Sequence, residues 1–272
     1  MPGPDDHEQA VQCGDGLSCR NGLKFHREET ESVQRTRISG VSTENQEKNM
    51  KDKNQNSEDQ DNYEEQQRIT EEGNPAKPSG KAGAQMLHRM NESHDAVTNW
   101  GLDFLTLQSR DVVMDIGCGG GATLHRLSVR GAGYVVGVDY SAVSVHQSLE
   151  LNQEDVSDGK MCVLQASVEE LPFDDEFFDV ITTVESFYFW PDPQESLKEV
   201  RRVLKQGGHF MLIADIYDNG KLPESAKENI RRYQMTVPTA EEYRTLFRNA
   251  GFSDVLIHTK DGENWIAVEG IR

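Results

Sequence analysis

A glycine-rich segment follows a short apolar run near the middle of the chain. Asp115-Ile116-Gly117-Cys118-Gly119-Gly120-Gly121 comes directly after residues 112–114, which are Val, Val and Met. Glycines in such a loop let the backbone turn sharply and approach a ligand closely. A helix beginning at Ala122 would point its free amide groups and the positive end of its dipole at that ligand. The loop therefore predicts a binding site for a nucleotide-like molecule.

An acidic residue, Asp139, stands at the end of the next apolar run, residues 134–138. A carboxylate at the end of a second strand can accept hydrogen bonds from both hydroxyls of a ribose. Gly117, Gly119 and Ala122 also satisfy the dinucleotide fingerprint, in which such an acid follows the second strand. Spacing alone therefore leaves open whether the cofactor is a nicotinamide or flavin dinucleotide or another nucleotide.

Two candidate catalytic residues lie outside the glycine loop, one before the first apolar run and one after the fourth. Glu185 directly follows the run 177–184, and His94 lies in the segment 86–100, which is expected to form a helix across the mouth of the site. Either side chain can serve as a general base, although a lone histidine in a helix is more often solvated or structural. The aromatic residues after Glu185 either line a substrate pocket or cover the sheet edge, and the pocket candidates are Phe187, Tyr188 and Trp190.

Apolar runs alternate with helical patterns from residue 112 onward. Ser141, the pair Asp192-Pro193 and the capping box from Thr239 to Glu242 mark the starts of three helices, the second of which is expected to include Leu204 on its apolar face. Strands are expected at residues 112–116, 134–138, 161–164, 177–184, 209–214, 254–258 and 264–269. This alternation predicts an α/β, Rossmann-like, doubly wound and mostly parallel seven-stranded sheet with helices on both faces. The ligand site of such a fold lies at the carboxyl ends of the strands.

Composition divides the chain in two. Residues 1–80 consist largely of Glu, Gln, Asn, Asp, Ser, Lys and Gly, with almost no aliphatic clusters. Such a segment cannot bury enough apolar area to offset its ordering entropy, so we expect a disordered acidic tail. Residues 81–272 form the single expected domain, and a chain that begins near Lys81 is expected to keep its stability and its ligand affinity.

Charge and cysteine usage exclude several classes of function. The formal net charge of −19 opposes binding to nucleic acid, since that affinity comes from clustered Lys and Arg. No apolar run is long enough to cross a bilayer, and the first residues lack a signal peptide, so a cytoplasmic protein is expected. The spacing of Cys13 and Cys19 matches no common zinc pattern, and no metal site is predicted. The oligomeric state is not indicated.

Four segments in order resemble a known family. The chain is similar to class I S-adenosylmethionine-dependent methyltransferases, most of all to the methyltransferase domain of the ubiquinone/menaquinone type. The likeness extends from about Gly101 to Arg272, and its motifs are residues 113–121, 136–141, 171–173 with 178–180, and 199–208. A dinucleotide enzyme is not expected to share the last two motifs.

The resemblance implies a cofactor site and an activity. Asp115 and the loop from Gly117 to Gly121 would hold the amino-acid end of S-adenosylmethionine, and Asp139 its ribose. Ser167 stands where the family often has an Asp for the adenine, so its hydroxyl would bind without charge assistance. The predicted cofactor-binding residues are Asp115, Gly117, Cys118, Gly119, Gly121, Asp139, Tyr140, Ser141, Ser167 and Val168.

The resemblance also implies methyl transfer by direct in-line displacement, most simply to a small molecule. The alternatives are an NAD(P)-dependent oxidoreductase on a similar fold and a non-catalytic module that only binds the cofactor.

Overall fold

The computed structural model describes residues 64–272, so most of the predicted tail, residues 1–63, lies outside the described residues. The part of that tail that is described contains a helix over residues 64–73. Arg89 ties this helix to the domain, because its guanidinium donates hydrogen bonds to the carbonyl oxygen of Gln66 at 3.0 Å and to the hydroxyl of Thr70 at 2.5 Å.

One seven-stranded sheet has the strand order β3-β2-β1-β4-β5-β7-β6. Neighbours among β1 to β5 pair in parallel, whereas β7 is antiparallel to both β5 and β6. The prediction of a mostly parallel Rossmann-like sheet is therefore confirmed. The strands are β1 (Val112–Ile116), β2 (Tyr134–Asp139), β3 (Met161–Gln165), β4 (Phe178–Val184), β5 (Leu204–Ala214), β6 (Ser253–Thr259) and β7 (Ile266–Ile271).

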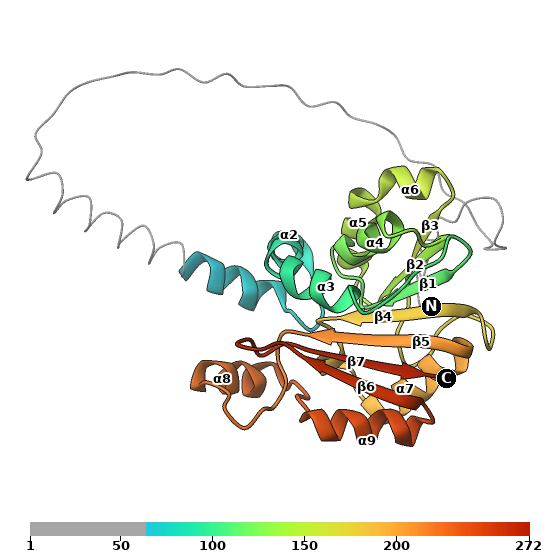
Figure 1. Cartoon of the computed structure of the whole chain (residues 1–272). Helices are drawn as coiled ribbons and strands as arrows, with labels where there is room; N and C mark the ends of the chain where they lie inside the picture. The colour runs from blue at the N-terminus through green and yellow to red at the C-terminus, as the bar shows by residue number, and fades with distance from the viewer. Residues whose placement is uncertain (1–63) are drawn as a thin grey trace, which may run out of the picture.

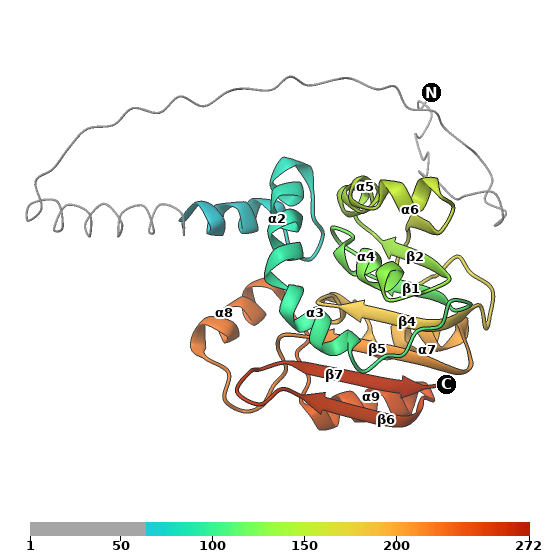
Figure 2. The ribbon, with the colours of Figure 1, turned by 45° about the horizontal axis from the view of Figure 1, so that its top comes forward.

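Helices cover both faces of this sheet (Figure 1). The described helices are α2 (Gly80–Ser93), α3 (Asp95–Leu102), α4 (Ala122–Val129), α5 (Ala142–Leu151), α6 (Gln153–Ser157), α7 (Pro193–Val203), α8 (Glu224–Tyr233) and α9 (Ala240–Ala250), with a 3₁₀ turn, η1 (Phe187–Phe189). Helices α3, α4 and α5 pack on one face, and α7 and α9 on the other. Figure 2 shows α3 next to the end of β4, and α2 beyond it, farther from the sheet.

The alternating side chains of the strands build two cores. Val113 of β1 packs with Leu124 of α4 on one face, while Met114 of the same strand packs with Leu197 of α7 on the other. Successive side chains of a strand point to opposite faces, so a central strand covered on both sides is apolar throughout. This burial holds the carboxyl ends of β1, β2 and β4 in one fixed edge.

The three predicted helix starts are confirmed. The Ser141 hydroxyl accepts a hydrogen bond from the amide of Ser144, and Asp192 accepts from the amides of Gln194 and Glu195. The capping box that joins Thr239 and Glu242 is complete. Each cap supplies acceptors for amide groups that have no partner inside the helix.

Two predicted helices differ in extent from the observed ones. Leu204 is the first residue of β5 rather than a helical residue, and it pairs with Phe178 before a register shift that leads to the pairing of Val180 with His209. The bulged stretch between them includes Gly207, whose φ of 72° favours glycine. The single helix expected over residues 86–100 is interrupted at His94, which separates α2 from α3.

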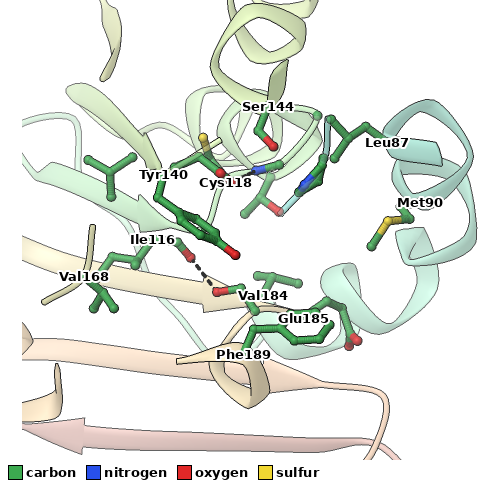
Figure 3. A pocket seen from close by; sticks show the side chains of 18 of the residues that line it. Leu87, Met90, Ile116, Cys118, Tyr140, Ser144, Val168, Val184, Glu185 and Phe189 are labelled. Atoms are coloured by element: carbon green, nitrogen blue, oxygen red, sulfur yellow. Dashed lines mark hydrogen bonds between the residues drawn. The ribbon is translucent and has the colours of Figure 1, made fainter. Parts of the chain in front are cut away.

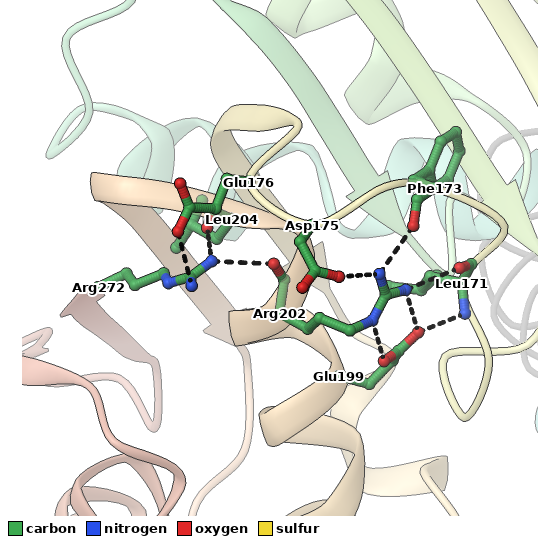
Figure 4. A network of polar contacts seen from close by, with 8 residues as sticks. All are labelled: Leu171, Phe173, Asp175, Glu176, Glu199, Arg202, Leu204 and Arg272. Carbon is green, nitrogen blue, oxygen red and sulfur yellow. Dashed lines mark hydrogen bonds and ion pairs between the residues drawn. The ribbon is translucent and has the colours of Figure 1, made fainter.

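A polar network fixes the chain that leads into β4 (Figure 4). Arg202 of α7 donates hydrogen bonds to the carbonyl oxygens of Leu171 and Phe173 and pairs with Glu199 and Asp175 at 2.8 and 2.7 Å. These carboxylates raise the pKa of the Arg202 guanidinium, so the group stays charged. The network holds the loop after β3 against α7.

None of the helices between residues 64 and 272 is both long and apolar enough to cross a bilayer.

Candidate active site

A cavity lies at the carboxyl ends of β1, β2 and β4, beneath the junction of α2 and α3 (Figure 3). The glycine loop after β1 forms one wall, and Leu87 and Met90 of α2 form another. The predicted helical cover over the site is therefore present, as two helices in place of one. Asn91 connects it to the loop, because its amide donates a hydrogen bond to the carbonyl oxygen of Gly120 at 3.1 Å.

The glycine loop has the backbone conformation that its sequence predicts. Gly117, Gly119 and Gly121 have φ values of 72°, 54° and 82°, which side-chain-bearing residues rarely adopt. A Cβ on Gly117 would lie 2.3 Å from the hydroxyl oxygen of Ser186. A Cβ on Gly119 would make only ordinary contacts, with the Leu87 side chain at 3.5 Å and the carbonyl oxygen of Gly117 at 3.9 Å, so Gly119 leaves open a space that a ligand can fill.

Asp139 organises the loop from its position at the end of β2. The carboxylate is buried, with one oxygen accepting from the amide of Gly119 at 3.0 Å and the other from the amide of Ser141 at 2.8 Å. Burial raises the pKa of Asp139, which the two amides partly offset. Each carboxylate oxygen has a further lone pair, so the group can still accept hydrogen bonds from a ligand in the cavity.

Asp115 lies behind the loop rather than in the cavity wall. Its carboxyl is fully buried, and one oxygen accepts a hydrogen bond from the Thr182 hydroxyl at 2.6 Å. Burial raises the pKa of this group to about 7, with a further contribution from the charge of Asp139. Asp115 is therefore placed to support the loop from below.

Most of the other predicted cofactor residues meet at the cavity. Gly117, Cys118, Gly119, Asp139, Tyr140, Ser167 and Val168 all line it. Gly121 and Ser141, the N-cap residues of helices α4 and α5, do not line it. The loop after β1 and the end of β2 thus come together with the loop after β3, as the topology requires.

The aromatic residues after β4 divide between cavity and core. Phe189 and Trp190 line the cavity, and Trp190 also belongs to the buried core, whereas Phe187 and Tyr188 belong to the core alone. The 3₁₀ turn η1 produces this split, since it directs Phe187 toward Trp190 and Tyr243, at ring-centroid distances of 4.9 and 5.4 Å. All three predicted pocket aromatics therefore pack in the core, and Trp190 alone of the three also lines the cavity.

A short segment before α2 completes the cavity, and composition had placed it in the tail. Pro75, Ala76 and Pro78 line the cavity next to Tyr140. We call residues 75–78 the strap. Its proline pair was the one available signal, because proline fixes the backbone of a connecting segment. The Tyr140 hydroxyl donates to the carbonyl oxygen of Ala76, and the Ser141 hydroxyl to that of Pro78 at 2.5 Å.

Comparison with known proteins places this site in a family. Residues 114–212 match the family model described as a methyltransferase domain. The chain contains a class I S-adenosylmethionine-dependent methyltransferase domain. This match favours S-adenosylmethionine over the dinucleotides that the glycine loop had left open.

Two relatives are methyltransferases whose names each include a small molecule. The chain is 34% identical over 162 residues to the chloroplastic 2-methyl-6-phytyl-1,4-hydroquinone methyltransferase of Arabidopsis thaliana, a match over 59% of this chain and 44% of that protein. It is 30% identical over 145 residues to the sarcosine/dimethylglycine N-methyltransferase of Halorhodospira halochloris, over 53% of this chain and 52% of that protein. The chain thus spans about half the length of these relatives.

Solved structures share the fold. A phosphoethanolamine N-methyltransferase of Haemonchus contortus in complex with S-adenosyl-L-methionine has a TM-score of 0.61 and 15% identity, over 70% of this chain and 57% of that one. A geranyl diphosphate C-methyltransferase of Streptomyces coelicolor has a TM-score of 0.55 and 18% identity, over 71% of this chain and 83% of that one.

The two predicted base candidates of this methyltransferase domain lie at the same end of the cavity. Glu185 follows β4 and His94 joins α2 to α3, and Asp215, which sequence reasoning missed, follows β5. One ligand-type atom from each of the three lies within 4.8 Å of the others. The order of strands β4 and β5 in the sheet was the available signal for Asp215, because neighbouring parallel strands end side by side.

Glu185 is held firmly in this cluster. One oxygen accepts from the Tyr188 hydroxyl at 2.8 Å and the other from the backbone amide of Asp215. Burial raises the pKa of the Glu185 carboxyl well above its ordinary value, and the nearby Asp215 adds to this effect. The three groups are close enough to hold a metal ion, but exposed acidic groups such as Asp215 are common without one, and we assign no metal here.

Proposed function

We propose that the protein transfers the methyl group of S-adenosylmethionine to a small-molecule acceptor by direct in-line displacement. One observation carries the proposal: a single cavity joins the glycine loop and Asp139 to an apolar, aromatic end that also holds His94 and Glu185. A cofactor site and an acceptor site must share such a space, because the donor methyl group and the acceptor atom have to meet in line.

The residues of the cavity fit the parts of the cofactor. The open space at Gly119 admits the amino-acid end beside the backbone, and Asp139 offers its remaining lone pairs to the ribose hydroxyls. Ser167 and Val168 stand at the end of β3 for the adenine. Gly117 and Cys118 form the floor, while Tyr140 and the strap close the outer side.

The cofactor supplies an activated methyl group bound to a sulfonium. The protein therefore has to orient an acceptor and exclude water rather than form a covalent intermediate. Leu87, Met90 and Phe189 give the acceptor end an apolar lining that serves both purposes. The net charge of −19 supports a small molecule over a nucleic acid as acceptor.

Ligand-dependent stability tests the cofactor assignment. A ligand that binds only the native state raises the thermal midpoint by mass action. S-adenosylhomocysteine should stabilise the protein and NADH should not, and the reverse result would favour the oxidoreductase alternative. Transfer of radiolabel from S-adenosylmethionine to a panel of small acceptors then tests turnover. Strong cofactor binding without transfer to any acceptor class would instead indicate a non-catalytic module.

A further inference from the structure

Three titratable side chains converge beside the acceptor end of the cavity from distant parts of the chain. Glu185 comes from the end of β4, Asp215 from the end of β5 and His94 from the break between α2 and α3. Glu185 is only 7% exposed, and its φ of 53° is a conformation that costs free energy in a residue with a side chain. Such strain at a cavity is typical of functional positions.

Among the described residues, no lysine or arginine forms an ion pair with either acid of this cluster. The cation that acts on His94 is Arg89, but its guanidinium is bound to Gln66 and Thr70. The remaining polar neighbour, Tyr188, donates its hydroxyl proton to Glu185 and brings no positive charge. Burial and the charge of the exposed Asp215 both disfavour the ionised form of Glu185, and a cationic ligand beside the pair would offset that cost.

We propose that the acceptor is an amine, which enters as an alkylammonium ion, and that His94 removes its proton. This inference rests on the methyl transfer proposed above. The N–H bond of the ammonium breaks, its proton moves to a ring nitrogen of His94, and the bonding pair stays on the amine nitrogen as the lone pair that attacks. The carboxylate of Asp215 then stabilises the imidazolium that forms.

Charge distinguishes this acceptor from a hydroxyl compound. An ammonium ion is cationic when it arrives, and its methylated product is cationic again, so the acids favour both states. A phenol or hydroquinone would instead become an anion next to the carboxylate of Asp215, whose charge disfavours it. Phe189 and Trp190 line the same cavity, and aromatic rings also attract a cation.

The properties of His94 suit a base. Burial lowers the pKa of its imidazole, and Arg89 acts in the same direction, while Asp215 opposes them. The neutral ring that accepts a proton is thus favoured before the substrate arrives. Its side chain makes no helix-capping hydrogen bond, so a substitution there need not unfold α3.

Turnover by the full chain tests the base. Sarcosine and dimethylglycine serve as amine probes and trimethylhydroquinone as the hydroxyl probe. His94→Gln should lower kcat for an amine by about 100-fold, with a much smaller change in KM. The control is His88→Gln, on the preceding helix α2 and with a side chain that is 78% exposed, and it should keep wild-type kcat. Methylation of trimethylhydroquinone without methylation of the amines would overturn the proposal, as would full activity of His94→Gln on amines.

Binding of tetramethylammonium tests the cationic subsite without requiring turnover. This ion has no proton to lose and no lone pair to methylate, so calorimetry on the S-adenosylhomocysteine complex reports affinity alone. Asp215→Asn should weaken this binding by at least about tenfold, because a charge close to the ion is lost. Asp261→Asn, in the exposed turn between β6 and β7, is the matched control and should bind as wild type.

The two assays separate the two proposals. If S-adenosylhomocysteine fails to stabilise the chain, the proposed function itself is wrong. If S-adenosylhomocysteine stabilises the chain but tetramethylammonium does not bind, the amine subsite is wrong. The amine subsite is also wrong if Mg²⁺ binds the wild-type complex and displaces tetramethylammonium. Should no probe of either class be methylated, binding of tetramethylammonium with the expected loss in Asp215→Asn supports the subsite, and its absence overturns it.

Discussion

The hydroxyl of Tyr140, directly after β2, donates a hydrogen bond to the carbonyl oxygen of Ala76, in the strap that precedes α2. The ammonium group of Lys77 lies 5.2 Å from the centroid of the same ring, and Ser141 holds Pro78. The strap is thereby attached to the corner that bears Asp139. A segment with a tail-like composition thus becomes one wall of the cavity.

Removing the Tyr140 hydroxyl should loosen the strap. Tyr140→Phe keeps the ring but loses the bond to Ala76, so S-adenosylhomocysteine should dissociate faster while the thermal midpoint of the free protein changes little. Stopped-flow fluorescence measures the dissociation rate. Tyr233→Phe on α8, outside the cavity, is the control, and equal rates in the two variants would show that the strap does not retain the ligand.

Truncation should separate the strap from the segment before it. A chain that begins at Glu64 keeps residues 75–78 and should bind S-adenosylhomocysteine as the full chain does. A chain that begins at Lys81 lacks the contacts to Tyr140 and Ser141 and should bind more weakly, contrary to the expectation from composition alone. Calorimetry on the two chains tests this, and equal affinities would restore the boundary at residue 80.

Asp139→Asn should weaken cofactor binding by about 1 to 3 kcal/mol, since a charged acceptor is lost for the ribose hydroxyls. The amide also has only one oxygen, so one of the bonds from the amides of Gly119 and Ser141 loses its acceptor, and the thermal midpoint should fall. Asp174→Asn, on an exposed loop, is the control. Unchanged affinity in calorimetry would refute the ribose assignment.

Gly119→Val should abolish cofactor binding in a protein that remains folded. The valine side chain would enter the open space beside Leu87, and the φ of 54° adds a cost of roughly 1 to 2 kcal/mol. Gly220→Val is matched to it, because Gly220 has a φ of 74° and a Cβ added there would have no atom within 4 Å. Gly220→Val has the backbone cost alone and should bind the cofactor normally. Normal cofactor affinity in Gly119→Val would contradict the assigned role of the loop.

Asp115 should make stability depend on pH. Burial raises its pKa in the folded protein to about 7, above the value of 3.8 for an unshifted carboxyl. The protonated form is therefore favoured by folding, and its contribution is complete below about pH 4 and is lost as the pH rises toward about 7. Asp115→Asn cannot ionise and still accepts from Thr182. Denaturant unfolding between pH 4 and 8 should show the variant gaining stability relative to wild type as the pH rises, and a constant difference would contradict the raised pKa.

The sequence by itself determined the sheet and the cofactor end of the site. The apolar runs, the caps at Ser141, Asp192 and Thr239, and the glycine loop act over a few residues, so their spacing specifies local structure directly. The carboxyl ends of parallel strands meet at one edge, so the order of the strands alone places Asp139 beside Gly119.

Only the tertiary structure decided which residues complete the cavity. The break at His94, the split of the aromatic residues by η1, and the strap each depend on contacts between segments that are far apart in the chain. Asp215 meets Glu185 because β4 and β5 lie side by side, and Asp215 raises the pKa of the Glu185 carboxyl further because that carboxyl is buried away from water. Local sequence patterns do not identify such partners, because burial and the resulting pKa shifts arise from the packing of the whole domain.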